Sequence, residues 1–112
     1  MKVVIAVVAI LLLGYLLLRR TSDISGADAR RLVGEGAKLV DVRSPEEFAG
    51  GHLPGAINVP VQQLDGRMGE IGPHDQPVVV YCQSGMRSAR AASTLRQAGF
   101  ASVHNLGPMS AW

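Results

Sequence analysis

The sequence predicts an α/β fold in which a parallel sheet is flanked by helices on both faces. Short apolar runs rich in β-branched residues, such as 78–80, alternate along the chain with segments of helical pattern. Continuous apolar runs of this kind are typical of strands that helices cover on both sides. Because ligands bind beyond the carboxyl ends of such strands, we expect the functional site at that edge of the sheet.

Length and composition restrict the protein to one small domain and exclude several functions. The chain has 112 residues, and an apolar N-terminus leaves about 90 of them for a single core. From Ile24 onward acidic and basic residues balance, and the chain has one tryptophan, two tyrosines and two phenylalanines, so we expect no nucleic-acid partner. A single cysteine and three histidines without ligand spacing imply no disulfide, metal or cofactor.

Residues 1–20 are predicted to form a single transmembrane anchor. Residues 3–18 carry no charge and span about 24 Å as a helix, and Lys2 and Arg19 can extend this reach by snorkelling. A cleaved signal peptide is the alternative, but Arg19 and Arg20 occupy the place where small residues should precede a cleavage site. The positive-inside rule favours a single-pass protein of the plasma (inner) membrane with a cytoplasmic C-terminal domain.

Residues 21–23 are predicted to form a short polar linker, and the domain itself is expected to cover 24–112. Ser25 and Asp28 have the spacing of a helix N-cap, and Ser44 followed by a proline and two glutamates has the same signature. The predicted helices are 25–34, 45–50, a weak helix at 60–68, and 88–98, and the predicted strands are 38–42, 57–59, 78–80 and 101–106.

The cysteine lies where the strand at 78–80 has ended and the helix at 88–98 has not yet begun. A turn at this point aims backbone amides and the positive end of the helix dipole at Cys82, and Arg87 adds a cation. One alternative is that Cys82 is simply a small buried hydrophobic residue. Gly85, which permits a positive φ, and the Cys-x-x-Gly-x-Arg spacing instead favour a thiolate with a lowered pKa.

Three segments, in order along the chain, resemble the rhodanese-like sulfurtransferases. The resemblance covers residues 24–112. The segments are Leu39-Val40-Asp41-Val42-Arg43-Ser44-Pro45-Glu46-Glu47-Phe48 with Gly51-His52-Leu53-Pro54-Gly55-Ala56-Ile57-Asn58-Val59-Pro60, then Cys82-Gln83-Ser84-Gly85-Met86-Arg87-Ser88, and the closing Asn105-Leu106-Gly107-Pro108-Met109-Ser110-Ala111-Trp112. Family members usually have Gly-Gly where this chain has Gly107-Pro108.

The resemblance implies a thiosulfate-type sulfurtransferase, which the predicted N-terminal anchor would hold at a membrane. Cys82 would take a sulfane sulfur from a thiosulfate-type donor, become a persulfide, and pass the sulfur to a thiophilic acceptor. Substrate-binding groups would be the backbone amides of Gln83, Ser84, Gly85, Met86 and Arg87, with the side chains of Arg87 and Arg43. Asp41 and Ser88 are expected to support the site, His52 to be structural, and Glu46 and Glu47 to be solvated or capping charges.

Two other kinds of function are compatible with a cysteine in this loop. Related phosphatases and arsenate reductases share a thiolate cradle, but these phosphatases need Cys-x5-Arg, and this chain has the shorter Cys-x4-Arg. A non-enzymatic sulfur carrier or membrane scaffold is the other alternative. With no second cysteine to resolve the persulfide, the acceptor must be external: cyanide, a low-molecular-weight thiol or a partner protein.

Overall fold

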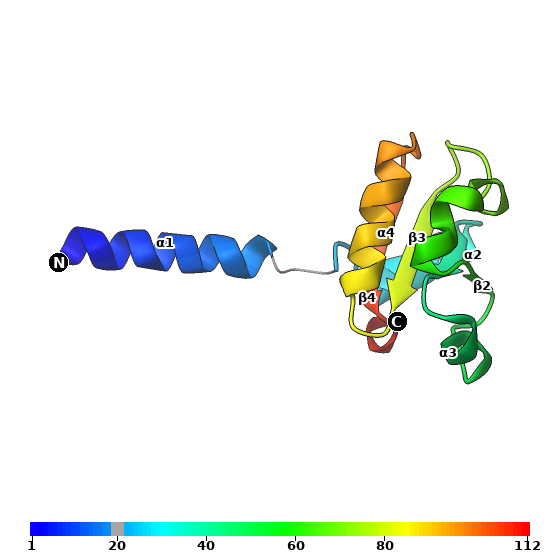
Figure 1. Cartoon of the computed structure of the whole chain (residues 1–112), viewed down its shortest axis with the longest axis horizontal. Helices are drawn as coiled ribbons and strands as arrows, with labels where there is room; N and C mark the ends of the chain where they lie inside the picture. Colours follow the sequence, from blue (N-terminus) through cyan, green and yellow to red (C-terminus); the bar gives the residue numbers. More distant parts are fainter. Residues whose placement is uncertain (19–21) are drawn as a thin grey trace.

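The computed structural model describes residues 1–18 and 22–112 and has the predicted alternation of strands and helices. Figure 1 shows the elements in sequence colours. The helices are α1 (Lys2–Leu18), α2 (Gly26–Gly34), α3 (Pro45–Ala49) and α4 (Met86–Gln97), and the strands are β1 (Lys38–Asp41), β2 (Ile57–Asn58), β3 (Val78–Cys82) and β4 (Val103–Pro108). Three short 3-10 helices complete the fold: η1 (Val61–Gly66), η2 (Met68–Glu70) and η3 (Met109–Ala111).

The four strands form one parallel sheet in the order β2-β1-β3-β4. Strand β3 lies between β1 and β4 and is buried along its whole length. Its side chains alternate between two cores, because successive residues of a strand point to opposite faces. Val78, Val80 and Cys82 face one core, and Val79 and Tyr81 face the other. The α/β class and the parallel sheet are therefore confirmed.

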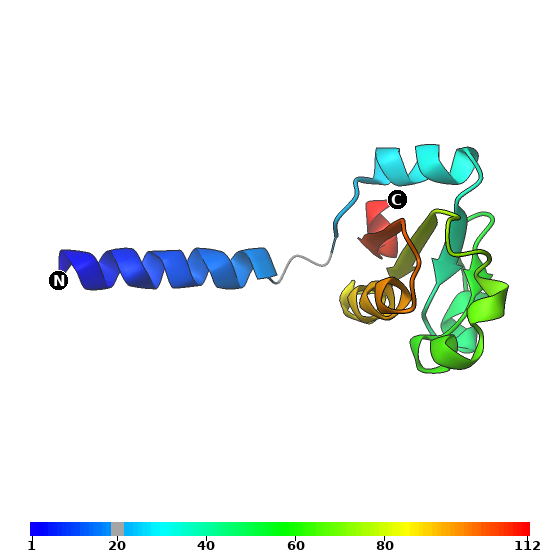
Figure 2. The ribbon, with the colours of Figure 1, turned by 90° about the horizontal axis from the view of Figure 1, so that it is seen from above.

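Helices cover both faces of the sheet, as predicted. Helix α4 and η1 pack on the face that receives Cys82, through residues such as Leu95 and Leu64. Helix α2 and η3 pack on the opposite face, and the two layers are separated by the sheet in Figure 2. A side chain at Gly26 would collide with the carbonyl oxygen of Ala111, so this glycine permits the close approach of α2 and η3.

Both predicted N-caps are present, whereas one predicted helix has a different form. Ser25 accepts a hydrogen bond from the amide of Asp28, and Ser44 and Glu47 form a complete capping box at the start of α3. The weak helix expected at 60–68 is instead the 3-10 helix η1, which ends at Gly66. A short, glycine-terminated segment lacks the length for a stable α-helix, and 3-10 turns are common in such connections.

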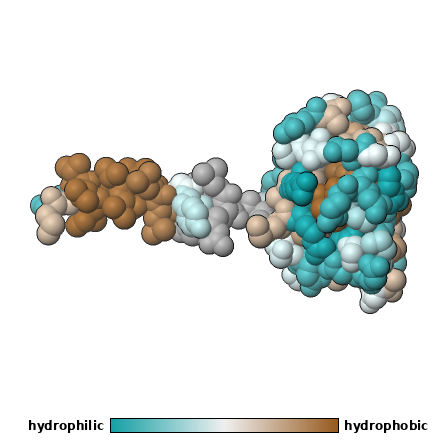
Figure 3. Space-filling view, viewed as in Figure 1, coloured by the Kyte–Doolittle hydropathy of each residue, from teal (hydrophilic) through white to brown (hydrophobic). Residues whose placement is uncertain are grey.

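The predicted transmembrane helix is not found. Helix α1 has 17 residues, which at 1.5 Å each gives about 26 Å, less than the bilayer core of about 30 Å. Among residues 1–18 and 22–112, no helix combines the length and the apolar character that crossing a membrane requires. The side chains of α1 from Val3 to Leu13 are nevertheless largely apolar and exposed, as the brown surface in Figure 3 shows. Arg19, Arg20 and Thr21 lie outside the described residues.

Two residues of the expected linker are part of the folded domain. The hydroxyl of Ser22 donates to the carbonyl oxygen of Leu106 at 2.6 Å, and the backbone amide of Asp23 donates to the carbonyl oxygen of Asn105 at 2.8 Å. The Asp23 carboxylate accepts from the Asn105 amide at 2.6 Å and from Arg96 at 2.7 Å. Ser22 and Asp23 thus cover part of the outer edge of β4, which would otherwise present unpaired backbone groups.

Replacing Asp23 by alanine should lower the free energy of unfolding by about 1–2 kcal/mol, because a half-exposed carboxylate loses two hydrogen-bond partners. Urea denaturation of the full chain measures this change. Asp28→Ala is the matched control, since the Asp28 side chain forms an exposed ion pair with Arg31 at 3.7 Å and its backbone hydrogen bond to Ser25 is kept by alanine, and we expect a change within about 0.5 kcal/mol. Equal effects of the two substitutions would contradict a structural role for Asp23.

Candidate active site

Cys82 is fully buried at the carboxyl end of β3. Its position follows from the strand, because residues 78, 80 and 82 share one face and the first two pack under α4. Strand β3 ends at Cys82, and α4 begins four residues later at Met86. The thiol therefore lies at the predicted edge of the sheet, between a strand end and a helix N-terminus.

The loop between β3 and α4 turns back toward the sulfur through Gly85. This glycine has a φ of +98°, which strains any residue with a side chain, and it is the N-cap of α4. Its amide donates to Sγ of Cys82 at an N···S distance of 2.9 Å. The left-handed conformation at this position thus lets a backbone donor reach the sulfur.

Ser88, in the first turn of α4, contacts the sulfur from the helix side. Its buried hydroxyl lies 3.4 Å from Sγ of Cys82 and donates to the carbonyl oxygen of Gly85 at 3.0 Å. When Cys82 is a thiol, Ser88 accepts its S–H; when Cys82 is ionised, the hydroxyl can rotate and donate to the sulfur. The structure places this predicted supporting residue in direct contact with the reactive atom.

The pKa of Cys82 lies below the ordinary value for a thiol. Burial alone raises this pKa, because a charge is less well solvated inside the protein. The Ser88 hydroxyl and the backbone amides of Ser88, Gly85 and Ser84 lower it, and together they outweigh burial. These contacts stabilise the nucleophilic form of the sulfur, as the sequence predicted from the turn and the helix dipole.

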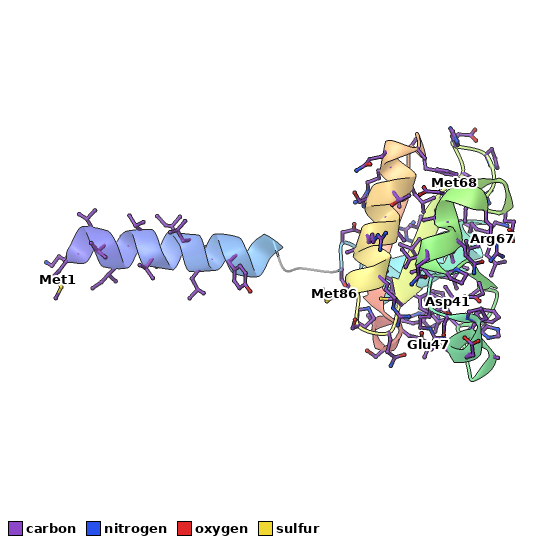
Figure 4. The ribbon with its side chains drawn as sticks, viewed as in Figure 1. Met1, Asp41, Glu47, Arg67, Met68 and Met86 are labelled. Atoms are coloured by element: carbon purple, nitrogen blue, oxygen red, sulfur yellow. The ribbon has the colours of Figure 1, made fainter. Side chains whose placement is uncertain are left out.

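The remaining loop residues form the rim of the site. Gln83 and Ser84 are exposed, and Met86 has 74% of its surface accessible to solvent. Figure 4 labels Met86 at the start of α4. Their predicted roles in binding substrate stay predictions.

Arg87 forms an ion pair that the sequence did not indicate. Its two terminal nitrogens donate to the two carboxylate oxygens of Glu47, at 2.6 Å and 3.0 Å. This bond lowers the pKa of Glu47 to about 2, with further contributions from Ser44. We expected Glu47 to be a solvated or capping charge. It does complete the capping box of α3, but it also joins α3 to the active-site loop.

Asp41 and Arg43 form a second, buried ion pair next to the site. The Arg43 guanidinium donates to both Asp41 oxygens, with a shortest distance of 2.8 Å, and the Asp41 hydrogen bond raises the pKa of Arg43. Arg43 also donates to the carbonyl oxygen of Gly51 at 2.7 Å and to Oε1 of Gln83 at 3.4 Å. Arg43 therefore ties β1 to two loops, and its contact with substrate stays a prediction.

His52 and Tyr81 support neighbouring loops. The His52 ring stacks on Phe48 with centroids 3.7 Å apart, and its Nδ1 lies 3.0 Å from the Phe48 carbonyl oxygen. This arrangement agrees with the expected structural role of His52. The buried Tyr81 hydroxyl accepts a hydrogen bond from the amide of Leu53 at 3.0 Å, a contact that no sequence motif predicts.

Fold and site together define an α/β protein with an activated cysteine in a cradle of amides. The chain belongs to the rhodanese-like domain family, whose model matches residues 25–112. The uncharacterized protein YqhL of Bacillus subtilis is 51% identical over 77 residues, which are 68% of this chain and 60% of that protein. A protein of Allochromatium vinosum named sulfurtransferase is 46% identical over 79 residues, 70% of this chain and 73% of its own length.

A solved structure has the same fold. The human single-domain sulfurtransferase TSTD1 superposes with a TM-score of 0.68 at 30% identity, over 80% of this chain and 89% of that chain. The chain thus spans 60% to 73% of the two bacterial proteins and most of the human one.

Replacing Ser88 by alanine should slow alkylation of Cys82 by iodoacetamide at neutral pH roughly three- to tenfold, because the thiolate loses a donor. The pH profile of alkylation should move to higher pH, since the substitution raises the Cys82 pKa. Ser84→Ala is the control, because the Ser84 contribution comes from its backbone amide, which this substitution keeps. An unchanged profile for Ser88→Ala would show that the hydroxyl does not stabilise the thiolate.

Proposed function

We propose that this protein is a sulfurtransferase that moves a sulfane sulfur through a Cys82 persulfide. The observation that carries the proposal is the buried sulfur held by the Gly85 amide at 2.9 Å and the Ser88 hydroxyl at 3.4 Å, with a lowered thiol pKa. Persulfide chemistry needs an ionised sulfur and donors that stabilise its charge. The names of the Allochromatium and human relatives support the same reaction class.

The reaction would take place in two displacements. The Cys82 thiolate attacks the sulfane sulfur of a thiosulfate-type donor, a new S–S bond forms, and the donor S–S bond breaks as sulfite leaves with the electron pair. An acceptor nucleophile then attacks the outer sulfur of the persulfide, and the Cys82 thiolate leaves. The two displacements balance without net oxidation or reduction.

The amides of residues 83–87 would hold the anionic donor and the outer sulfur of the persulfide. This proposal is supported by the amides of Ser84 and Gly85, which already stabilise the thiolate. Arg87 and Arg43 are proposed to bind the donor by hydrogen bonds, each through N–H groups that its ion pair leaves unused, while the paired carboxylate offsets its charge. A guanidinium has five N–H donors, so an arginine paired with a carboxylate can still bind a second anion.

A sulfur-carrier role that delivers sulfur to an acceptor protein is the second candidate. Cys82 is the only cysteine of the sequence, so the persulfide must be resolved from outside the chain. Met86, with 74% of its surface exposed at the rim, would offer an adaptable apolar contact for such a partner. Carrier and enzyme differ in the acceptor and share the persulfide.

Incubation of the protein with thiosulfate should add about 32 Da, one sulfur atom, to Cys82, as measured by intact-protein mass spectrometry. Cyanide or a low-molecular-weight thiol should remove this mass. Cys82→Ser is the control and should gain none. A wild-type protein that stays unmodified by thiosulfate and by alkyl thiosulfonates would refute the sulfurtransferase proposal, and Cys82-dependent hydrolysis of para-nitrophenyl phosphate would favour phosphatase chemistry instead.

We also propose that α1 attaches the protein to the plasma (inner) membrane, with residues 22–112 on the cytoplasmic side. The exposed apolar side chains of α1 support attachment, and the basic Arg19 and Arg20 of the sequence support this orientation. Attachment would bring the sulfur acceptor and Cys82 together at a lipid surface.

The full chain should sediment with membranes and be released by a non-ionic detergent, because the apolar side chains of α1 would bury themselves in lipid. A green fluorescent protein fused after Trp112 should fluoresce, whereas an alkaline phosphatase fused there should be inactive. Recovery of the chain in the supernatant would contradict attachment, and an active phosphatase fusion would reverse the orientation.

A further inference from the structure

Arg87, which the sequence predicts to attract an anionic donor, already forms an ion pair with Glu47. Both terminal nitrogens of Arg87 face Glu47 in a two-bond arrangement, and about a third of each side chain is exposed. The Arg87 guanidinium is close enough to the site for the Cys82 thiolate to raise its pKa. Glu47 thus places a full negative charge next to the one arginine of the active-site loop.

Contacts with Ser44 at the start of α3 and with Arg87 on α4 together fix the position of the Glu47 carboxylate. Its Oε1 accepts from the Ser44 amide at 3.1 Å, and the Glu47 amide donates to the Ser44 hydroxyl at 3.2 Å. Figure 4 shows Glu47 and Asp41 at the carboxyl end of the sheet, where β3 leads into the active-site loop. Because the Glu47 pKa is about 2, this carboxylate is ionised throughout the physiological range.

The charges around Cys82 therefore cancel in pairs. Asp41 neutralises the buried Arg43, and Glu47 neutralises Arg87. Attraction for an anionic donor then comes mainly from backbone amides and the helix N-terminus, whose partial charges are equivalent to about half an elementary charge. Next to the Cys82 thiolate, each negative charge on a donor is then repelled, so a donor with two negative charges is disfavoured more than a donor with one.

We propose that Glu47 is a positioning residue that sets the preferred charge of the sulfur donor. Glu47 holds Arg87 and compensates its charge. It thereby favours donors with a single negative charge, such as alkanethiosulfonate anions, over dianionic thiosulfate. This inference rests on the proposed sulfurtransferase function. In the favoured reaction the Cys82 thiolate takes the terminal sulfur of the thiosulfonate, and a sulfinate leaves with the electron pair of the broken S–S bond.

The test substitutes Glu47→Gln and compares two donors. Glutamine retains the capping box, because its side chain also bonds the N-cap amide, while the compensating charge is lost. The ratio of kcat/KM for thiosulfate to kcat/KM for methanethiosulfonate should rise roughly three- to tenfold at low ionic strength. Glu46→Gln is the matched control. It removes the same charge one residue away, from a side chain without a bond to Arg87, and the ratio should change less than twofold.

Arg87 provides a second check. In an Arg87→Gln background, Glu47→Gln should raise the donor ratio less than it does in the wild type, because no guanidinium is left to turn toward the donor and only the loss of the Glu47 charge remains. If Glu47→Gln lowers both rates equally, Glu47 has only a structural role, and the proposal is overturned. If Glu46→Gln raises the ratio as much as Glu47→Gln, the effect is general surface charge, and the proposal is also overturned.

Alkylation of Cys82 separates this inference from the function on which it rests. Iodoacetate and iodoacetamide are similar in size and differ by one negative charge, and a change in the Cys82 pKa affects both rates equally. Glu47→Gln should raise the ratio of iodoacetate to iodoacetamide rates roughly threefold. An unchanged ratio refutes charge selection by Glu47. A raised ratio in a protein that transfers no sulfur from any donor refutes the proposed function and supports the role of Glu47.

Discussion

Burial of β3 along its whole length is the constraint on which both cores and the reactive thiol depend. The strand divides its side chains between the α4 layer and the α2 layer, so it forms part of each core. The same alternation places Cys82 in a position without access to bulk water. A buried thiolate is costly unless hydrogen-bond donors replace the lost hydration. The loop that follows β3 supplies those donors.

The loop after β3 both starts helix α4 and supplies hydrogen-bond donors to the sulfur. The positive φ of Gly85 reverses the chain, starts α4, and aims an amide at the sulfur. Ser88 is one turn further along and adds a side-chain donor from the helix. Because strand, turn and helix are continuous, the geometry at the sulfur is held by the same packing that stabilises the sheet. This arrangement favours a preorganised site for an anionic sulfur.

Two ion pairs lie next to Cys82, and they differ in burial and in the segments that they connect. Asp41 and Arg43 are buried and connect β1 to the loops at Gly51 and Gln83, so their pairing keeps the walls of the site in place. Glu47 and Arg87 are partly exposed and lie at the rim. Each pair is neutral, which leaves the backbone amides as the main attraction for a negatively charged donor.

The sequence by itself determined the features that depend on near neighbours along the chain. Alternation of apolar runs and helical segments gave the parallel α/β fold, the serines at 25 and 44 gave the helix starts, and the Cys82-to-Gly85 spacing gave the activated thiol. Only the tertiary structure decided the pairs Glu47–Arg87, 40 residues apart, and Asp23–Arg96, 73 residues apart. Their side chains meet because the sheet aligns distant strand ends and edges, and such proximity leaves no periodic or local signal in the sequence. For the same reason, Glu47 could be predicted as a cap and Ser22 and Asp23 only as a linker.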